Sequence, residues 1–161
     1  MIIIGYQGIG KSTLANIDCF NEYIDLESGN FWIDEGIRHQ DWYIVYCNIA
    51  ESLSEQGYTV FVSSHKDVRN ELAKRNTYTV CCAPMPYLKE QWVKKLEDRY
   101  AQTHLSKDYK AWKNAEECFD DNIMDISNGG FDMIWITSMD YDLRELIEHS
   151  NSAKSVSKYQ D

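Results

Sequence analysis

Residues 5–12 read Gly5-Tyr-Gln-Gly-Ile-Gly-Lys-Ser12 and match the pattern G-x-x-x-x-G-K-[ST] at every fixed position. Gly5 and Gly10 can adopt backbone dihedrals that a side chain would forbid, so the loop can curl around an anion. Its N–H groups would then point inward at the start of a helix, where the helix dipole favours negative charge. The stretch therefore predicts a phosphate-binding loop.

The residues on either side of this loop have the character that it requires. Residues 1–4 are apolar and mostly β-branched, as in a buried strand, and Ser12–Ile17 is compatible with a helix. A glycine-rich turn can match a short pattern by chance, and these flanking elements argue against that. We therefore predict a triphosphate site in which Lys11 reaches the β and γ phosphates and the Ser12 hydroxyl ligates Mg²⁺. The expected binding residues are Gly5, Gly8, Gly10, Lys11, Ser12 and Thr13.

Strand and helix patterns alternate along the chain. Short β-branched or aromatic runs predict five strands, at residues 2–4, 23–26, 58–63, 78–82 and 133–137. Helical spacing predicts helices from residue 11 and at 40–56, 66–75, 88–102, 109–126 and 141–149. In the helix at 40–56 the expected inward face is Trp42, Val45, Tyr46, Ile49, Ala50 and Leu53. The pattern predicts an α/β fold, a five-stranded parallel sheet with helices on both faces.

Length and composition bound the organisation of the protein. The chain has 161 residues, enough for one domain, which we place at 1–149, followed by a polar tail at 150–161 that we expect to be disordered. No apolar run is long enough for a membrane span, and we expect no signal peptide, since the chain starts with the first strand. Five cysteines without metal spacing are typical of buried thiols in a reducing compartment, so we expect a cytoplasmic protein. The net charge of −10 argues against a general nucleic-acid binder, which would need a basic surface.

Polar side chains follow the expected second and third strands. Asp25 and Glu27 come at the end of the run at 23–26, and residues 63–66 read Ser-Ser-His-Lys after the third strand. Because a ligand of such a sheet lies at the carboxyl ends of its strands, these groups are candidates to organise Mg²⁺ and anchor a substrate. Acidic residues are also common in ordinary turns, and that interpretation stays open for Asp25 and Glu27.

A basic stretch stands out in the acidic chain. Seven of its 16 lysines and arginines lie between residues 89 and 113, and four acidic residues share that stretch. The basic residues are Lys89, Lys94, Lys95, Arg99, Lys107, Lys110 and Lys113. They either face a bound phosphate or form a solvated helix face, as most charge runs do.

Four segments together resemble the P-loop kinases of small molecules, the superfamily of nucleoside monophosphate, shikimate and gluconate kinases. They are G-Y-Q-G-I-G-K-S at 5–12, I-D-L-E-S at 24–28, V-F-V-S-S-H-K-D-V-R-N-E-L at 60–72 and L-K-E-Q-W-V-K-K-L-E-D-R at 88–99. The resemblance covers nearly the whole chain, and only the phosphate loop is highly specific. Among these kinases the chain is most similar in texture to small nucleotide kinases of bacteria and phages.

The resemblance implies a role for several residues. Lys11 would hold the donor triphosphate, and Ser12 with Asp25 would hold Mg²⁺ or orient the acceptor hydroxyl. Arg69 would be a cation that binds the acceptor, and Arg99 would begin a lid at about 99–113. Glu27 and the loop residue Phe31 would contact the acceptor, with Phe31 stacked on a base. In this chain Glu27 replaces a second aspartate, and Arg99 is the only arginine of the lid, where many relatives have two.

These expectations define the predicted function. The favoured activity is transfer of the γ-phosphoryl group from ATP, with Mg²⁺, to a small acceptor, with a nucleoside or nucleotide as the favoured class. A kinase of a non-nucleotide metabolite and a nucleotide-binding module without phosphotransfer are the alternatives. No N-K-x-D guanine motif is present, so a switch GTPase is disfavoured. The expected partners are ATP and the acceptor, with neither a membrane nor nucleic acid in general.

Overall fold

The computed structural model describes residues 1–34 and 37–157. The side chains of residues 32–34 and 154–157 are not described. Its centre is a five-stranded sheet in the order β2-β5-β1-β6-β7, and every neighbouring pair is parallel. The strands are β1 (Ile2–Gly5), β2 (Tyr23–Asp25), β5 (Thr59–Ser63), β6 (Thr79–Pro84) and β7 (Asp132–Ile136). The predicted α/β class and parallel sheet are confirmed.

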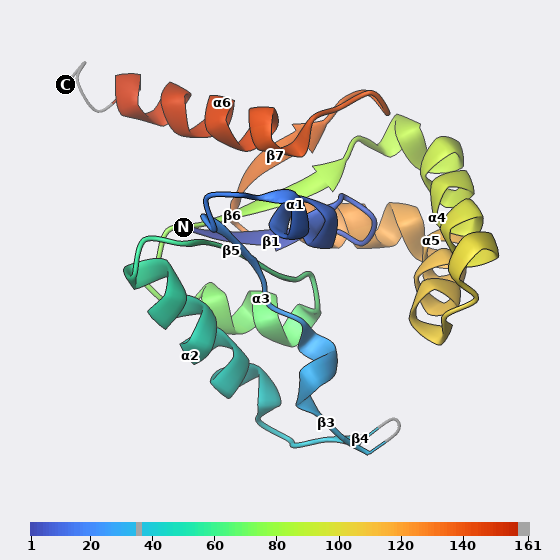
Figure 1. The fold of residues 1–161 in the computed structure, drawn as a ribbon, viewed down its shortest axis with the longest axis horizontal. Helices are drawn as coiled ribbons and strands as arrows, with labels where there is room; N and C mark the ends of the chain where they lie inside the picture. The colour runs from blue at the N-terminus through green and yellow to red at the C-terminus, as the bar shows by residue number, and fades with distance from the viewer. Residues whose placement is uncertain (35–36, 158–161) are drawn as a thin grey trace.

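The central strands are buried because helices cover both faces of the sheet. Ile3 of β1 pairs with Phe61 and Val80 on its two sides, and all three side chains are inaccessible or nearly so. The helices are α1 (Lys11–Ile17), α2 (Trp42–Glu55), α3 (Lys66–Leu72), α4 (Lys89–Thr103), α5 (Ser106–Ser127) and α6 (Leu143–Ser157), with short 3₁₀ turns η1 (Ser28–Phe31) and η2 (Pro86–Leu88). In Figure 1, α2 and α3 lie on one side of the sheet and α6 on the other.

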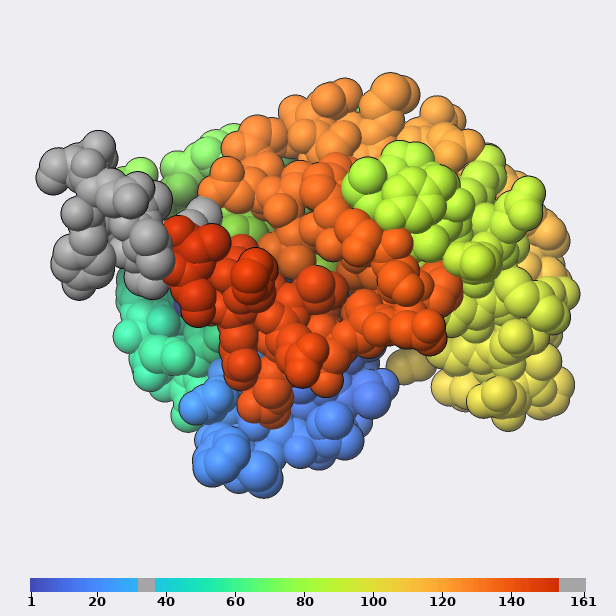
Figure 2. Space-filling view, turned by 90° about the horizontal axis from the view of Figure 1, so that it is seen from above, coloured from blue at the N-terminus to red at the C-terminus, as the bar shows by residue number. Residues whose placement is uncertain are grey.

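The helices α4 and α5 form an antiparallel hairpin at the end of the molecule toward which the β6 arrow points (Figure 1). Figure 2 shows this hairpin as a lobe at one end, beside the face covered by α6. The ring of Tyr100 stacks on Trp112 with centroids 5.8 Å apart and packs edge-on against Tyr109. Within α5, Cys118 has the non-helical dihedrals φ −129° and ψ 16°.

Several element boundaries differ from the sequence predictions. A two-stranded antiparallel hairpin, β3 (Trp32–Asp34) and β4 (Ile37–Arg38), was not predicted. The last helix, expected at 141–149, continues as α6 to Ser157, into the predicted tail; residues 158–161 lie outside the described part. Val45 and Ile49 were expected to face inward, but they are 53% and 38% exposed. The apolar stripe of α2 is wider than the face that β5 and α3 cover.

The strand β6 was expected to stop before Pro84, yet it includes that residue. Met85 N–H donates to Ile136 O of β7, whereas Cys82 O accepts from Tyr6 N–H on the β1 side. Successive residues of a parallel strand form their backbone hydrogen bonds on alternate sides. The backbone N of Pro84 therefore faces the β1 side, where β1 has already ended at Gly5. The missing N–H of proline therefore costs no ladder hydrogen bond.

No helix in the described residues has the length and apolar character needed to cross a membrane.

Candidate functional site

In the loop between β1 and α1, Gly10 has a positive φ as expected and Gly8 has one too, whereas Gly5 does not. Gly8 and Gly10 have φ of +83° and +100°, values that favour glycine. A Cβ at Gly5 would lie 2.7 Å from side-chain atoms of Ile9 and Lys11, so the loop closes tightly on its first residue. Within the described part of the chain, the N–H groups of Gly8, Gly10, Lys11 and Ser12 donate to no backbone carbonyl. These amides are available to an anion.

Lys11 lies against the inside of this loop. Its Nζ donates to the carbonyl oxygens of Gly5 at 3.1 Å and Tyr6 at 3.4 Å. Burial lowers the pKa of Lys11, while the negative charges of Asp25 and Glu27 act to raise it. A bound phosphate would act in the same direction as these carboxylates and stabilise the ammonium. The side chain is therefore a half-buried cation on the cavity wall, where a further anionic partner could bind.

Ser12 and Asp25 are in direct contact, as the sequence predicts. Ser12 begins α1, and Asp25 ends β2, which pairs with β5 on the far side from β1. The Ser12 hydroxyl donates to Asp25 Oδ2 at 2.5 Å. Hydroxyl and carboxylate oxygens are ligands that suit Mg²⁺, which usually keeps several waters and also takes phosphate oxygens. No cluster of three or more His, Cys, Asp or Glu that could hold a metal occurs among the described residues. A cation here would therefore need oxygens from a ligand and from water.

One cavity of about 250 Å³ brings most of the predicted site residues together. The loop between β1 and α1, the residues after β2 and β5, and the α4–α5 hairpin all contribute to its wall. The predicted residues on that wall are Gly5, Gly8, Lys11, Ser12, Asp25, Glu27 and Arg99. Sequence reasoning did not single out Gln7 or Lys107 individually as site residues, and both line the cavity. The cavity thus combines cations, carboxylates and free amides at the carboxyl edge of the sheet.

Arg99 reaches this cavity from the C-terminal half of α4, before its last turn. Its Nη2 lies 2.8 Å from Oδ1 of the buried Asp108, on the first turn of α5. Asp108 also accepts a hydrogen bond from the Thr103 hydroxyl at 2.6 Å. The Arg99 Nε is buried and, among the described residues, has no hydrogen-bond partner. The position fits the predicted contact with a triphosphate, and the ion pair with Asp108 holds the two helices of the hairpin together.

Two predicted acceptor residues lie outside this cavity. Arg69 is buried, and its Nε and Nη1 donate to Ser64 O at 3.0 Å and Asp125 O at 3.1 Å. Its Nη2 forms an ion pair with the Asp125 carboxylate, so Arg69 ties α3 to α5. Arg69 lines a separate hollow next to the cavity. The Phe31 ring packs edge-on against Tyr46, with centroids 5.3 Å apart, and faces another hollow that includes His39 and Val45.

A further hollow of about 660 Å³ adjoins the cavity and shares Gln7, Glu27, Ser28, Ser63 and Lys107 with it. Its other walls carry Arg38, His65, Lys110 and Asn114. Arg38 comes from the hairpin that the sequence did not reveal, and its guanidinium lies 4.1 Å from the centroid of the Trp42 ring. Lys110 was part of the basic stretch, whereas nothing in the local pattern pointed to Asn114.

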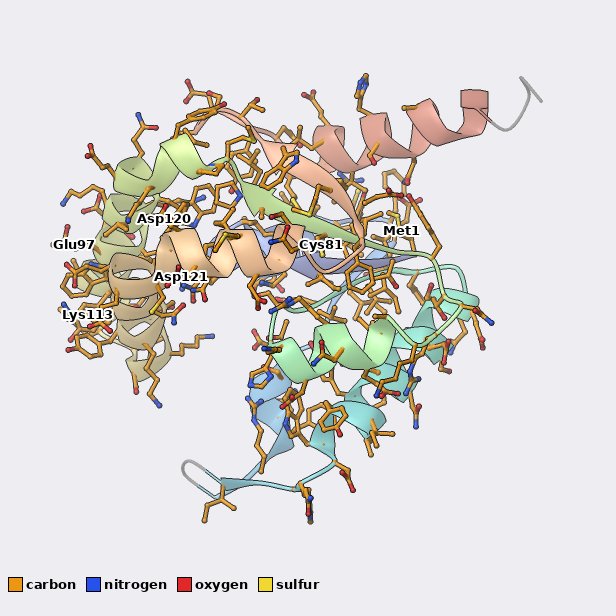
Figure 3. The ribbon with its side chains drawn as sticks, turned by 180° about the vertical axis from the view of Figure 1, so that it is seen from behind. Met1, Cys81, Glu97, Lys113, Asp120 and Asp121 are labelled. Atoms are coloured by element: carbon orange, nitrogen blue, oxygen red, sulfur yellow. The ribbon has the colours of Figure 1, made fainter. Side chains whose placement is uncertain are left out.

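The basic stretch divides between the two interpretations that its sequence allowed. Lys94 and Lys113 form ion pairs with Glu97 and Glu116 on the surface of the hairpin. Figure 3 shows Glu97 and Lys113 on the side of the hairpin that faces away from the sheet. Arg99 and Lys107 line the cavity instead.

A scan of the chain against protein-family models gives no match, and searches of curated proteins and of solved structures give no significant match.

Proposed function

We propose that this chain is an ATP-dependent phosphotransferase that moves the γ-phosphoryl group to a small acceptor, with a nucleoside or nucleotide as the favoured class. The observation that carries the proposal is the convergence of Lys11, the Ser12–Asp25 pair and the free loop amides on one cavity. We also assign the parallel sheet to the P-loop NTPase fold, because β1 leads directly into the phosphate loop and α1.

The chain's own groups divide the work of such a transfer. The loop amides and Lys11 would bind and neutralise the β and γ phosphates, where charge is concentrated. Ser12 and Asp25 would hold Mg²⁺, which supplies further charge neutralisation when bound. An acceptor oxygen would attack the γ phosphorus from the adjoining hollow as the bond to the β-phosphate oxygen breaks and ADP leaves. Glu27 lies on the wall shared by the cavity and the hollow, where it can accept the proton that the acceptor loses.

The position and the charge of the adjoining hollow favour a site for an acceptor molecule over a site that holds only water. It shares a wall with the cavity, so a molecule bound there would lie next to the end of a triphosphate. Lys107, Lys110 and Arg38 give this hollow a positive side, which suits an acceptor that carries negative charge. Placing the acceptor beside the donor is the main contribution that a protein makes to phosphoryl transfer.

Production of ADP over many turnovers, measured with Mg²⁺ and a panel of acceptors, tests the proposal. Lys11→Ala removes the cation at the phosphates, and we expect the rate to fall about 10³-fold. The matched control is Lys94→Ala, which removes a surface lysine paired with Glu97 and Asp98. We expect the control to stay within about twofold of the wild type, since exposed ion pairs contribute little.

Three outcomes would separate the candidate functions. ADP formation that requires a nucleoside or nucleotide supports the proposal as stated. ADP formation that requires a different class of metabolite would support phosphotransfer but contradict a nucleoside or nucleotide as the acceptor. Binding of ATP without turnover on any acceptor would contradict phosphotransfer and favour a binding module. If Lys11→Ala bound and used ATP like the wild type, the assignment of the phosphate loop would be wrong.

A further inference from the structure

The outer side of the phosphate loop is covered by three side chains from distant parts of the sequence. Trp92 and Lys95 come from α4, and Tyr141 comes from the segment between β7 and α6. The Trp92 and Tyr141 rings stack with centroids 6.1 Å apart. A Cβ at Gly8 would lie 2.8 Å from Leu96 and 3.3 Å from the Trp92 indole nitrogen, so the loop sits directly on α4.

Two of these side chains hold backbone carbonyls of the loop. The indole N–H of Trp92, whose side chain is inaccessible to solvent, donates to Gln7 O at 2.9 Å. The Tyr141 hydroxyl donates to Ile9 O at 2.8 Å. In a trans peptide the C=O and the following N–H point in opposite directions, and no cis bond occurs in the described residues. The N–H of Gly8 therefore points away from Trp92, and the N–H of Gly10 points away from Tyr141.

These two amides are among those that donate to no backbone carbonyl in the described residues. Gly8 lines the cavity, on the side of the loop opposite to Trp92. Because Gly8 and Gly10 have no side chain to restrict them, their peptide planes can rotate freely unless something fixes the carbonyls. The hydrogen bonds from Trp92 and Tyr141 thus determine where the N–H groups of Gly8 and Gly10 point.

Lys95 adds a charge to this arrangement. Its Nζ donates to the Tyr141 hydroxyl at 2.8 Å and lies 4.4 Å from the Trp92 ring centroid and 4.9 Å from that of Tyr141. Burial lowers the pKa of Lys95, and the positive charge of Arg99 acts in the same direction. Within residues 1–34 and 37–157, the ammonium contacts two rings and a hydroxyl and forms no ion pair with a carboxylate. An anion in the loop would compensate part of its charge, and the chain of hydrogen bonds polarises the peptide between Ile9 and Gly10.

We propose that Trp92, Lys95 and Tyr141 are positioning residues that orient the Gly8 and Gly10 amides toward bound phosphate. The inference rests on the triphosphate site proposed above. The three residues touch no substrate: they act through the loop, from the side opposite to the cavity. They also link the hairpin and the β7–α6 segment to the loop, so the orientation of its amides depends on both.

The test uses Tyr141→Phe, which removes one hydroxyl and keeps the stacked ring. The matched control is Tyr87→Phe, because the Tyr87 hydroxyl also donates to a backbone carbonyl, Thr137 O at 2.7 Å, on an exposed ring. Calorimetric binding of a non-hydrolysable ATP analogue with Mg²⁺ gives the affinity, and thermal unfolding gives the stability of each variant. We expect Tyr141→Phe to weaken the affinity about five- to tenfold and Tyr87→Phe to leave it within about twofold.

A second measurement follows the loop without any ligand. In ¹⁵N-correlated spectra of the free protein, Tyr141→Phe should shift the Gly10 amide more than the Gly8 amide. Lys95→Met, which keeps most of the apolar stem, should shift the same Gly10 signal and weaken analogue binding, because the hydroxyl loses its charged donor. Tyr87→Phe should leave both glycine signals in place.

The outcomes distinguish this inference from the proposed function. If the wild-type protein does not bind the analogue, the triphosphate site is wrong and the positioning role falls with it. If the wild type binds and Tyr141→Phe binds equally well, the positioning role alone is overturned. A lower melting temperature with unchanged affinity and an unchanged Gly10 signal would show that Tyr141 only packs the structure, which also overturns it.

Discussion

The Tyr46 hydroxyl is a single group on which two edges of the cavity depend. It donates to Leu26 O at 2.6 Å and accepts from Ser63 N–H at 2.9 Å. Leu26 follows β2 and Ser63 ends β5, and both residues line the cavity beside Asp25. Tyr46 is completely buried, and burial raises the pKa of its phenol, so the hydroxyl is neutral at ordinary pH. Tyr46→Phe removes this one oxygen and leaves the ring in place.

The expected loss of stability follows from the two backbone groups that lose their partner. Each partly buried backbone group left without a hydrogen bond costs about 1–2 kcal/mol, so the variant should lose about 2–4 kcal/mol of unfolding free energy. For a domain of this size, 1 kcal/mol corresponds to about 2–4 °C, and the melting temperature should fall by roughly 5–15 °C. The strand ends would also lose their common anchor, so binding of Mg²⁺ and ATP should weaken as well.

Urea unfolding of the wild type and the variant measures this loss, with equal slopes as the condition for comparing midpoints. Tyr87→Phe is the control, since its hydroxyl donates to Thr137 O from an exposed ring and should cost less than about 0.5 kcal/mol. A loss below about 0.5 kcal/mol for Tyr46→Phe would refute the reasoning, because water or a backbone shift would then satisfy both groups.

Three further predictions concern the site and the buried thiols. Asp25→Asn should keep ATP binding within about tenfold but lower turnover by about 10²-fold or more, since the charge at the metal position is lost; equal turnover would contradict this role. Hydrogen exchange of residues 99–113 should slow with Mg²⁺ and a non-hydrolysable ATP analogue if they form a lid; equal exchange in both states would show a fixed hairpin. Burial raises the pKa of the Cys81 and Cys82 thiols to about 12 from 9.0. Unfolded thiols ionise first as pH rises, so their contribution to stability should be complete below about pH 9 and decrease toward pH 12, as urea midpoints under reducing conditions would show.

The contact between Ser12 and Asp25 could be predicted from sequence because two strong constraints combine there. The phosphate-loop pattern fixes where β1 ends and α1 begins, and parallel strands bring their carboxyl ends to one edge. A polar residue that directly follows a strand next to β1 or β5 must then lie near the same edge of the sheet. The same logic placed Glu27 and Ser63 near the cavity, without any knowledge of the helices that cover the sheet.

Arg69 and Phe31 show where such reasoning ends. Arg69 forms an ion pair with Asp125, a residue 56 positions away. No local sequence pattern reveals which distant carboxylate a buried arginine pairs with. Phe31 belongs to a 3₁₀ turn whose direction depends on Trp42 and Tyr46 of α2. Tertiary packing decides both positions, whereas periodicity only reports which face of an element is apolar.

The break at Cys118 divides α5 into two parts. On one side of it the helix belongs to the hairpin, where Arg99 pairs with Asp108. On the other side Phe119 packs edge-on against Tyr6, at 5.7 Å between ring centroids, and Asp125 holds Arg69. A helix bends most easily where its backbone already departs from helical geometry. Cys118 therefore lets α5 change direction between the part that pairs with α4 through Arg99 and Asp108 and the part that packs on the sheet beside Tyr6.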